Sequence, residues 1–244
     1  AAACYCLRCP FGKQPNQCAY ECADDLETII EREGADTISA FIAEPIVGAS
    51  GGVLVPPAGY WPRIASICRK YDILLIADEV MTGFGRTGKK FAMEHWGITP
   101  DIMVLGKGLS GGYATISAVA TSQAFCQQLM DAGIQPMYHT YGAHPAACAA
   151  SVKVLEILQR EKLLERVTEL SGYFEKSMAP LMDHPHVAQV RGKGFFFAIE
   201  IVKDKNTLER YPQERSMAMQ LVKACLKRDC FVYFGGTGVV RDII

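Results

Sequence analysis

The stretch Ile73-Leu-Leu-Ile-Ala-Asp78 is a short, continuously apolar run that ends in a carboxylate. Apolar residues that are continuous rather than alternating predict a strand covered on both faces, as in a parallel sheet. A second apolar run, Ile102-Met-Val-Leu105, is followed by Gly106 and Lys107. Because ligands of open α/β sheets gather at the carboxyl ends of the strands, we expect Asp78 and Lys107 to lie at one edge.

The pairing of an amine with a carboxylate at such an edge needs a chemical reason. A lysine beside buried strand residues is costly unless its charge is paired or its amine is consumed covalently. One such reason is a covalent bond between Lys107 and pyridoxal phosphate, with Asp78 held against the pyridinium nitrogen. The other reading of Lys107 is an ordinary lysine whose stem lies along apolar surface.

Helices and strands alternate along the first part of the chain, which predicts a layered α/β sheet. Apolar periodicity, turn residues and capping residues predict helices over 24–32, 60–71 and 91–95, and strands over 37–43, 73–77, 102–105 and 116–120. Glu44, Asp78 and Lys107 each follow one of these strands. We therefore expect the three side chains to share the carboxyl edge of the sheet.

The second half of the chain has a different pattern. Two long helices are predicted over 145–160 and 163–181, followed by strands over 187–191 and 195–201, a helix over 214–228 and a strand over 231–234. We expect residues 1–160 to belong to a large domain and residues 161–244 to a smaller C-terminal α/β domain.

Composition narrows the class of protein. The chain has 244 residues, 50% of them hydrophobic, and a formal net charge of −1, which is typical of a globular protein with a sizeable core. No basic tract favours nucleic acid, and the apolar runs are too short to span a membrane. The first residues lack the order of a secretory signal, so we expect a cytoplasmic protein.

Five of the ten cysteines fall within the first 22 residues. Thiolates two to four positions apart can share a zinc ion, but these spacings do not form two matched zinc knuckles. Pro10 and Gly12 indicate an irregular loop in which reduced thiols help to pack the chain. Of the two interpretations we expect the second, and no metal.

Four motifs follow one another along the chain: Ala43-Glu-Pro-Ile-Val-Gly48, Ile76-Ala-Asp-Glu-Val-Met-Thr-Gly-Phe-Gly-Arg-Thr-Gly88, Pro100-Asp-Ile-Met-Val-Leu-Gly-Lys-Gly-Leu-Ser-Gly-Gly-Tyr113 and His139-Thr-Tyr-Gly-Ala-His-Pro145. Together they resemble the signatures of class III aminotransferases, the pyridoxal-phosphate enzymes that include ω-amino-acid transaminases. The resemblance implies fold type I, with a mainly parallel large-domain sheet and a smaller C-terminal α/β domain, incomplete at both ends here.

The resemblance also implies roles for individual residues. Lys107 matches the lysine that holds the cofactor as an internal aldimine and later moves a proton. Asp78 matches the carboxylate on the pyridine nitrogen, and Val80 the aliphatic residue against the ring face. Thr140 matches a hydroxyl that binds the cofactor phosphate across a homodimer interface.

Other matches are less specific. Glu44 resembles a glutamate near the substrate, although it could be a surface turn residue. Arg241 could bind a substrate carboxylate, or be a solvated arginine. Met81 stands where some members have a polar side chain that contacts the cofactor. We interpret the loop 85–88 as structural rather than as a phosphate site.

In the family, a phosphate-binding loop and a ring-stacking aromatic residue would precede Ala1, so we expect the chain to be a central-to-C-terminal part of a longer enzyme. The leading hypothesis is an aminotransferase that moves an amino group from an amine or ω-amino acid to a 2-oxo acid such as pyruvate or 2-oxoglutarate. The alternatives are an aminomutase or decarboxylase of the same family, or a non-catalytic remnant or dimerisation module.

Overall fold

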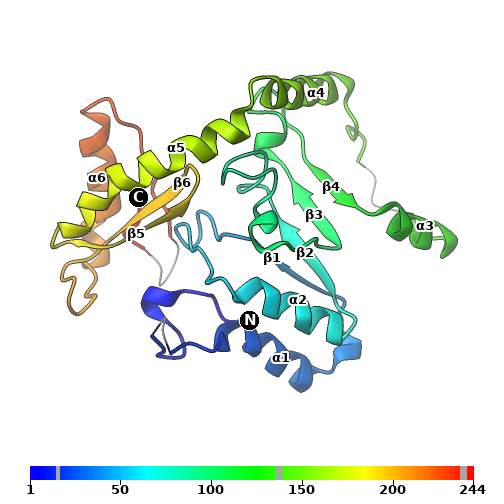
Figure 1. Ribbon diagram of the computed structural model, residues 1–244, viewed down its shortest axis with the longest axis horizontal. Helices are drawn as coiled ribbons and strands as arrows, with labels where there is room; N and C mark the ends of the chain where they lie inside the picture. Colours follow the sequence, from blue (N-terminus) through cyan, green and yellow to red (C-terminus); the bar gives the residue numbers. More distant parts are fainter. Residues whose placement is uncertain (15–16, 136–138, 237–240) are drawn as a thin grey trace.

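Four strands form the central sheet of the computed structural model, which describes residues 1–14, 17–135, 139–236 and 241–244 (Figure 1). β1 (Ala40–Ala43), β2 (Leu74–Asp78) and β3 (Ile102–Leu105) are parallel neighbours, and β4 (Ala118–Thr121) is antiparallel to β3. The expected mainly parallel sheet is confirmed.

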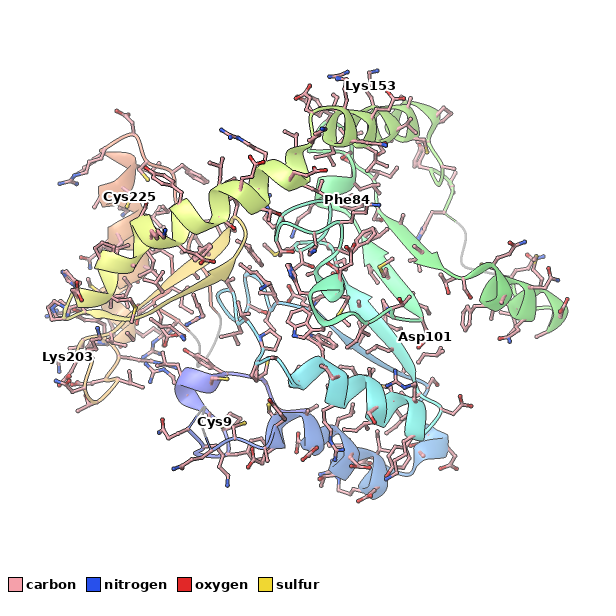
Figure 2. All side chains as sticks on the ribbon, viewed as in Figure 1. Cys9, Phe84, Asp101, Lys153, Lys203 and Cys225 are labelled. Atoms are coloured by element: carbon pink, nitrogen blue, oxygen red, sulfur yellow. The ribbon has the colours of Figure 1, made fainter. Side chains whose placement is uncertain are left out.

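The strand register sets the edge at which side chains converge. Ala43 of β1 lies opposite Ala77 of β2, and Asp78 lies opposite Val104 of β3. The carboxyl ends of the three strands therefore meet at one edge of the sheet. Asp101 lies at the other end of β3, where its Oδ2 accepts the Leu75 N–H at 2.8 Å (Figure 2).

One face of the sheet is covered by two amphipathic helices, α1 (Glu21–Glu33) and α2 (Tyr60–Lys70). Their buried faces form the main core with the sheet residues Leu75 and Ala77. The prediction of burial on both faces concerned the 73–78 strand: in β2, Leu75 and Ala77 are buried on one face, whereas Leu74 and Ile76 are half-buried on the other. On other strands the burial is lower still, since Ile42 is 58% and Val119 is 70% exposed.

Several predicted boundaries shift in the first half. α1 begins at Glu21 rather than 24, because the left-handed residue Tyr20 (φ 68°) precedes it. A 3₁₀ turn, η2 (Ala35–Thr37), occupies the start of the predicted 37–43 strand. β4 begins at Ala118 rather than 116, and the predicted 91–95 helix is a 3₁₀ helix, η3 (Ala92–Trp96).

One helix was not predicted at all. α3 (Gln123–Asp131) follows β4, and none of its residues is buried, although Phe125, Cys126, Leu129 and Met130 recur at helical spacing. Its start is fixed by Ser122, whose Oγ accepts the Phe125 N–H at 3.1 Å.

The second half is organised around a strand pair. α4 (Pro145–Arg160) has the predicted bounds, whereas α5 (Leu163–Met178) ends before 181 and continues as η5 (Ala179–Asp183). The ribbon shows α5 running from α4 to the antiparallel pair β5 (Val187–Lys193) and β6 (Phe196–Ile201) (Figure 1).

The last predicted elements are partly wrong. The 214–228 helix is divided into η6 (Gln213–Arg215) and α6 (Met217–Leu226). Residues 231–234 do not form the predicted strand; Phe231 and Tyr233 are instead largely exposed. The chain pairs with β6 further on, where Ile199 and Ile244 exchange two backbone hydrogen bonds of 2.7 and 3.1 Å. Within the described ranges, no helix combines the length and apolarity needed to cross a membrane.

A buried charge network joins the first residues of the chain to β6. The Glu200 carboxylate accepts hydrogen bonds from Tyr5 Oη, from Arg8 Nε at 3.1 Å and from Arg191 Nη1 at 2.6 Å. Burial alone would raise the pKa of Glu200, but the bonds from Tyr5 and Arg191 outweigh it and lower that pKa. No sequence motif marks this network, which we term the Glu200 network.

Candidate active site

Glu44 is the first of the three side chains at the carboxyl edge. It directly follows β1, is half-buried, and accepts the Gly48 N–H on Oε2 at 2.8 Å. Burial is the main reason that the pKa of Glu44 is raised, with a further rise from Asp78 and opposing effects of Gly48 and Lys107. Glu44 therefore feels the charges of the other two predicted residues.

Asp78 is the last residue of β2 and is half-buried. Its Oδ1 accepts the Val80 N–H at 3.0 Å, a local turn contact that fixes the carboxylate. In the described part of the chain, Oδ2 accepts no hydrogen bond. One carboxylate oxygen is thus held by the backbone, and the other is available to a ligand.

Lys107 follows β3 after a single glycine. Its side chain is exposed and has no hydrogen bond or ion pair with any residue that the structure describes. The expectation that Lys107 directly follows buried residues is confirmed for Leu105 and Gly106, but Lys107 itself is exposed, at the start of the 3₁₀ turn η4 (Lys107–Leu109). Lys107 also has φ 40°, in the left-handed region that favours glycine.

Such backbone strain costs of the order of 1–3 kcal/mol and gathers at functional sites. The neighbouring glycines allow close packing around the strained residue. A Cβ on Gly106 would lie 3.5 Å from Val80 Cγ1, and one on Gly108 would lie 3.0 Å from Phe84 Cβ. Val80 and Phe84 therefore lie against the backbone on either side of Lys107.

Met81 and Glu44 crowd the same glycine. A Cβ on Gly48 would lie 2.5 Å from Met81 Sδ and 2.8 Å from Glu44 Oε2. Met81 thus packs against the loop after β1, and its thioether offers only a weak hydrogen-bond acceptor.

A cavity of about 520 Å³ opens beside Lys107. Val80, Met81 and Phe84 line it from the segment that follows β2, and Figure 2 shows Phe84 where this segment approaches α5. The cavity is also lined by Arg86, from the loop interpreted as structural, and by residues that the sequence did not suggest: Leu158, Leu163, Arg166, Val167, Phe195 and Phe196. They come from distant parts of the chain, so no local motif could have placed them together.

The loop 85–88 is held by contacts along its backbone. The Arg86 carbonyl accepts the Phe195 N–H at 3.0 Å, and the Gly88 carbonyl accepts Thr168 Oγ1 at 3.0 Å. These bonds, to the turn before β6 and to α5, agree with the interpretation of a structural loop.

Glu79, beside Asp78 in the sequence, has a structural place. It is fully buried, and its carboxylate accepts the N–H groups of Ala92 and Met93, both at 2.9 Å, together with Thr82 Oγ1. Burial raises the pKa of Glu79, while these hydrogen bonds oppose the rise. Glu79 thereby fixes the start of η3 behind the candidate site.

Two predicted site residues lie apart from the cavity. Thr140 is exposed in a turn before α4. Arg241 is directed to Tyr211 and Gln213, with Nη2 3.4 Å from the Tyr211 carbonyl and Nη1 3.5 Å from Gln213 Oε1. The structure brings together Glu44, Asp78, Val80 and Lys107, but neither Thr140 nor Arg241.

The whole arrangement matches a known family. A profile described as aminotransferase class-III matches residues 4–240. The chain belongs to the class III aminotransferases. This class III chain is 42% identical over 216 residues to a putrescine–pyruvate aminotransferase of Pseudomonas aeruginosa. The match covers 87% of this chain and 46% of the relative. It is 41% identical over 206 residues to a taurine–pyruvate aminotransferase of Rhodobacter capsulatus, covering 81% of the chain and 44% of the relative.

Solved structures give the same family. An (S)-enantioselective omega-transaminase of Thermomicrobium roseum superposes with a TM-score of 0.90 and 40% identity over 99% of this chain and 53% of that one. An omega-transferase of Vibrio fluvialis gives a TM-score of 0.89 at 32% identity, over 99% and 56%. The class III chain thus has fold type I and spans about half the length of the curated relatives it matches.

Class III aminotransferases depend on pyridoxal phosphate. The residues present fit that group chemically. Lys107 offers an unpaired amine, Asp78 offers one carboxylate oxygen without a partner, and Val80 lies against the backbone beside the lysine. In the described residues no group of histidines, cysteines and carboxylates is arranged to hold a metal ion.

Proposed function

We propose that this chain provides the lysine, the ring-nitrogen carboxylate and part of the substrate site of an aminotransferase. The reaction moves an amino group from an amine or ω-amino acid to a 2-oxo acid. The convergence of Glu44, Asp78 and Lys107 at the ends of three parallel strands carries the proposal. Relatives named for putrescine, taurine and pyruvate support the substrate class.

When bound, pyridoxal phosphate supplies an electron-accepting ring that stabilises negative charge on the substrate carbon. Asp78 would hold a proton on the ring nitrogen through its free oxygen, since Oδ1 is already engaged by the Val80 N–H. Lys107 Nζ would move the proton at the reacting carbon, and its freedom from ion pairs leaves it able to do so. Val80, which lies against Gly106, would restrict the orientation of the pyridine ring of the cofactor.

Glu44 has a different part in the proposal. Its raised pKa and its place beside Asp78 and Lys107 make it a polar group at the substrate end of the site. Arg241 stays a predicted ligand for a substrate carboxylate, and it would need to leave Tyr211 and Gln213 to reach the cavity. We also propose that residues 1–160 and 161–244 are parts of the large and the small domain.

We propose a homodimer in which Thr140 binds the cofactor phosphate of the partner subunit. Its exposed turn, with the neighbouring Tyr141 86% exposed, supports a surface that a second subunit covers. Sedimentation of the chain at several concentrations tests this, and a single monomeric species throughout would refute it. We propose the cytoplasm as the compartment because all ten cysteines are free thiols.

The test of the reaction is covalent labelling. The 244-residue chain is incubated with pyridoxal phosphate, treated with borohydride and digested, and the peptides are analysed by mass spectrometry. A pyridoxyl group on Lys107 is expected, with none in Lys107→Ala and an unchanged amount in Lys89→Ala, a matched exposed lysine. Labelling spread evenly over exposed lysines would refute the assignment of Lys107.

A further inference from the structure

The first segment of the chain lies against the start of α1 (Figure 1). The Ala2 N–H donates to Asp25 Oδ2 at 2.7 Å, and Lys13 Nζ lies 3.3 Å from Glu21 Oε1. Figure 2 shows Cys9 in the loop between the 3₁₀ turn η1 (Cys6–Arg8) and α1. Two stretches rich in cysteine therefore meet, and we term their five thiols the cysteine cluster: Cys4, Cys6, Cys9, Cys18 and Cys22.

The thiols of the cysteine cluster are close enough to influence one another. Cys4 and Cys22 are buried in the same part of the core. Burial raises the pKa of Cys6, and Cys18 and then Cys9 raise it further. Burial also raises the pKa of Cys22 to about 11, and Cys18 is again the thiol with the largest additional effect. Cys18 thus lies at the centre of the cluster, near both Cys6 and Cys22.

Access from solvent separates the five thiols. Cys4 and Cys22 are 6% and 7% exposed, whereas Cys6, Cys9 and Cys18 are half-buried. Cys6 also lines a cavity of about 410 Å³ between the first segment, η5 and β5. A small oxidant therefore reaches Cys6 more readily than Cys22.

The sulfur of Cys18 has the contacts that a nucleophilic thiol needs. Its Sγ accepts the Tyr20 N–H at 3.3 Å and lies 3.5 Å from Glu21 Oε2, which accepts the thiol proton. The thiolate is the reactive form of cysteine, and the Tyr20 N–H remains as a donor to it when the proton leaves. Cys18 thus combines half-burial, a proton acceptor and a backbone donor at one sulfur.

We propose that Cys6 and Cys18 form a reversible disulfide on reaction with hydrogen peroxide, so that the cysteine cluster is a redox modification site. The Cys18 thiolate attacks the peroxide: an S–O bond forms, the O–O bond breaks, and the departing hydroxide takes up the thiol proton as water. Cys6 then attacks the sulfenic acid on Cys18: the S–S bond forms, the S–O bond breaks, and a second water leaves. The two sulfurs lose two electrons in total, and the peroxide gains them.

The position of Cys6 gives this disulfide a structural consequence. Tyr5 and Arg8, on either side of Cys6 in the sequence, both donate hydrogen bonds to Glu200. A bond from Cys6 to Cys18 would tie these two donors of the Glu200 network to the segment before α1. No residue of the candidate active site takes part, so the inference does not depend on transamination.

The experiment maps disulfides by mass spectrometry. The 244-residue chain is treated with hydrogen peroxide, the remaining thiols are blocked with iodoacetamide, and the chain is digested with trypsin without a reductant. Cleavage after Arg8, Lys13 and Arg32 gives peptides 1–8 and 14–32, so a Cys6–Cys18 disulfide joins these two peptides until dithiothreitol separates them.

The joined peptides should be the main oxidised product of the parent chain and should be absent in Cys6→Ser and in Cys18→Ser. Cys9→Ser, which removes another half-buried thiol of the cluster, is the matched control and should give the joined peptides as the parent does.

Four results would overturn the proposal. The first is joined peptides in Cys6→Ser, which would assign the bond to Cys4, and the second is their loss in Cys9→Ser. The third is a disulfide within peptide 14–32 as the main product, and the fourth is the same mixture of disulfides from the folded chain and from the chain unfolded in urea. If Cys6→Ser lowers the midpoint of thermal unfolding, Cys6→Ala decides, and joined peptides in that variant count against the proposal.

Discussion

Replacing Glu200 by glutamine tests whether the Glu200 network stabilises the fold. The side chain is 1% exposed, and its two oxygens accept three hydrogen bonds, two of them from arginines. An amide has one acceptor oxygen, so its NH₂ group would face a donor and the guanidinium of Arg191, 7% exposed, would lose its counter-charge.

Removing one partner of a buried ion pair costs about 3–5 kcal/mol. For a chain of this length, each kcal/mol lowers the midpoint of thermal unfolding by about 2–4 °C, so Glu200→Gln should lower it by about 6–20 °C. Urea unfolding followed by circular dichroism gives the free energy directly. The matched control is Glu209→Gln, which removes an exposed ion pair with Lys203 and should cost about 0–1 kcal/mol.

The pH dependence separates charge from packing. The folded pKa of Glu200 is lowered, so its contribution is full above the ordinary glutamate pKa of about 4.3 and is lost as the pH falls through the folded value. The difference between parent and Glu200→Gln should therefore be constant near neutral pH and shrink in acid. A difference no larger than that of Glu209→Gln, or one that persists unchanged in acid, would refute the reasoning.

Two further predictions follow from single contacts. Gly194→Ala should destabilise the chain by about 1–3 kcal/mol, because the residue has φ 64° and its Cβ would collide with Thr87. Gly172→Ala, in open space on α5, should instead stabilise the chain by about 0.5–1 kcal/mol. Urea unfolding measures both changes, and a change of the same sign in the free energy of unfolding for both variants would contradict the prediction. Burial and then Lys193 lower the pKa of His95 to about 4, so folded His95 stays neutral while the unfolded chain takes up a proton below about pH 6.5. The stability of the chain should therefore decrease as the pH falls from about 6.5 to about 4. In His95→Gln this decrease, measured by thermal unfolding, should be smaller, and an unchanged dependence of the unfolding midpoint on pH would count against the prediction.

The parts of the fold that sequence predicts well are those with local signals. β3 and α4 have the predicted bounds, since a bounded apolar run marks the first and Pro145 marks the start of the second. The convergence of Glu44, Asp78 and Lys107 also follows from sequence, because parallel strands place their carboxyl ends at one edge.

The parts that sequence does not predict depend on contacts between distant segments or on exposed surface. α3 has apolar residues at helical spacing but buries none of them, so it packs against no core. Lys107 is exposed and has a left-handed backbone, and the preceding apolar strand reveals neither. Arg86 and Arg166 line the same cavity because α5 packs against the loop after β2, and nothing in either segment specifies the other.

The Glu200 network has a consequence for how the chain is made. Tyr5 and Glu200 are 195 positions apart, so Glu200 does not yet exist when Tyr5 leaves the ribosome. At about 5–20 residues per second, the carboxylate is added about 10–40 s after the tyrosine. During that interval Arg8 and Tyr5 have no Glu200 to bind, whereas the core that buries Cys4 is formed by α1 and α2, which are made much earlier. Synthesis of β6 thus sets the earliest moment at which the buried Glu200 charges can pair.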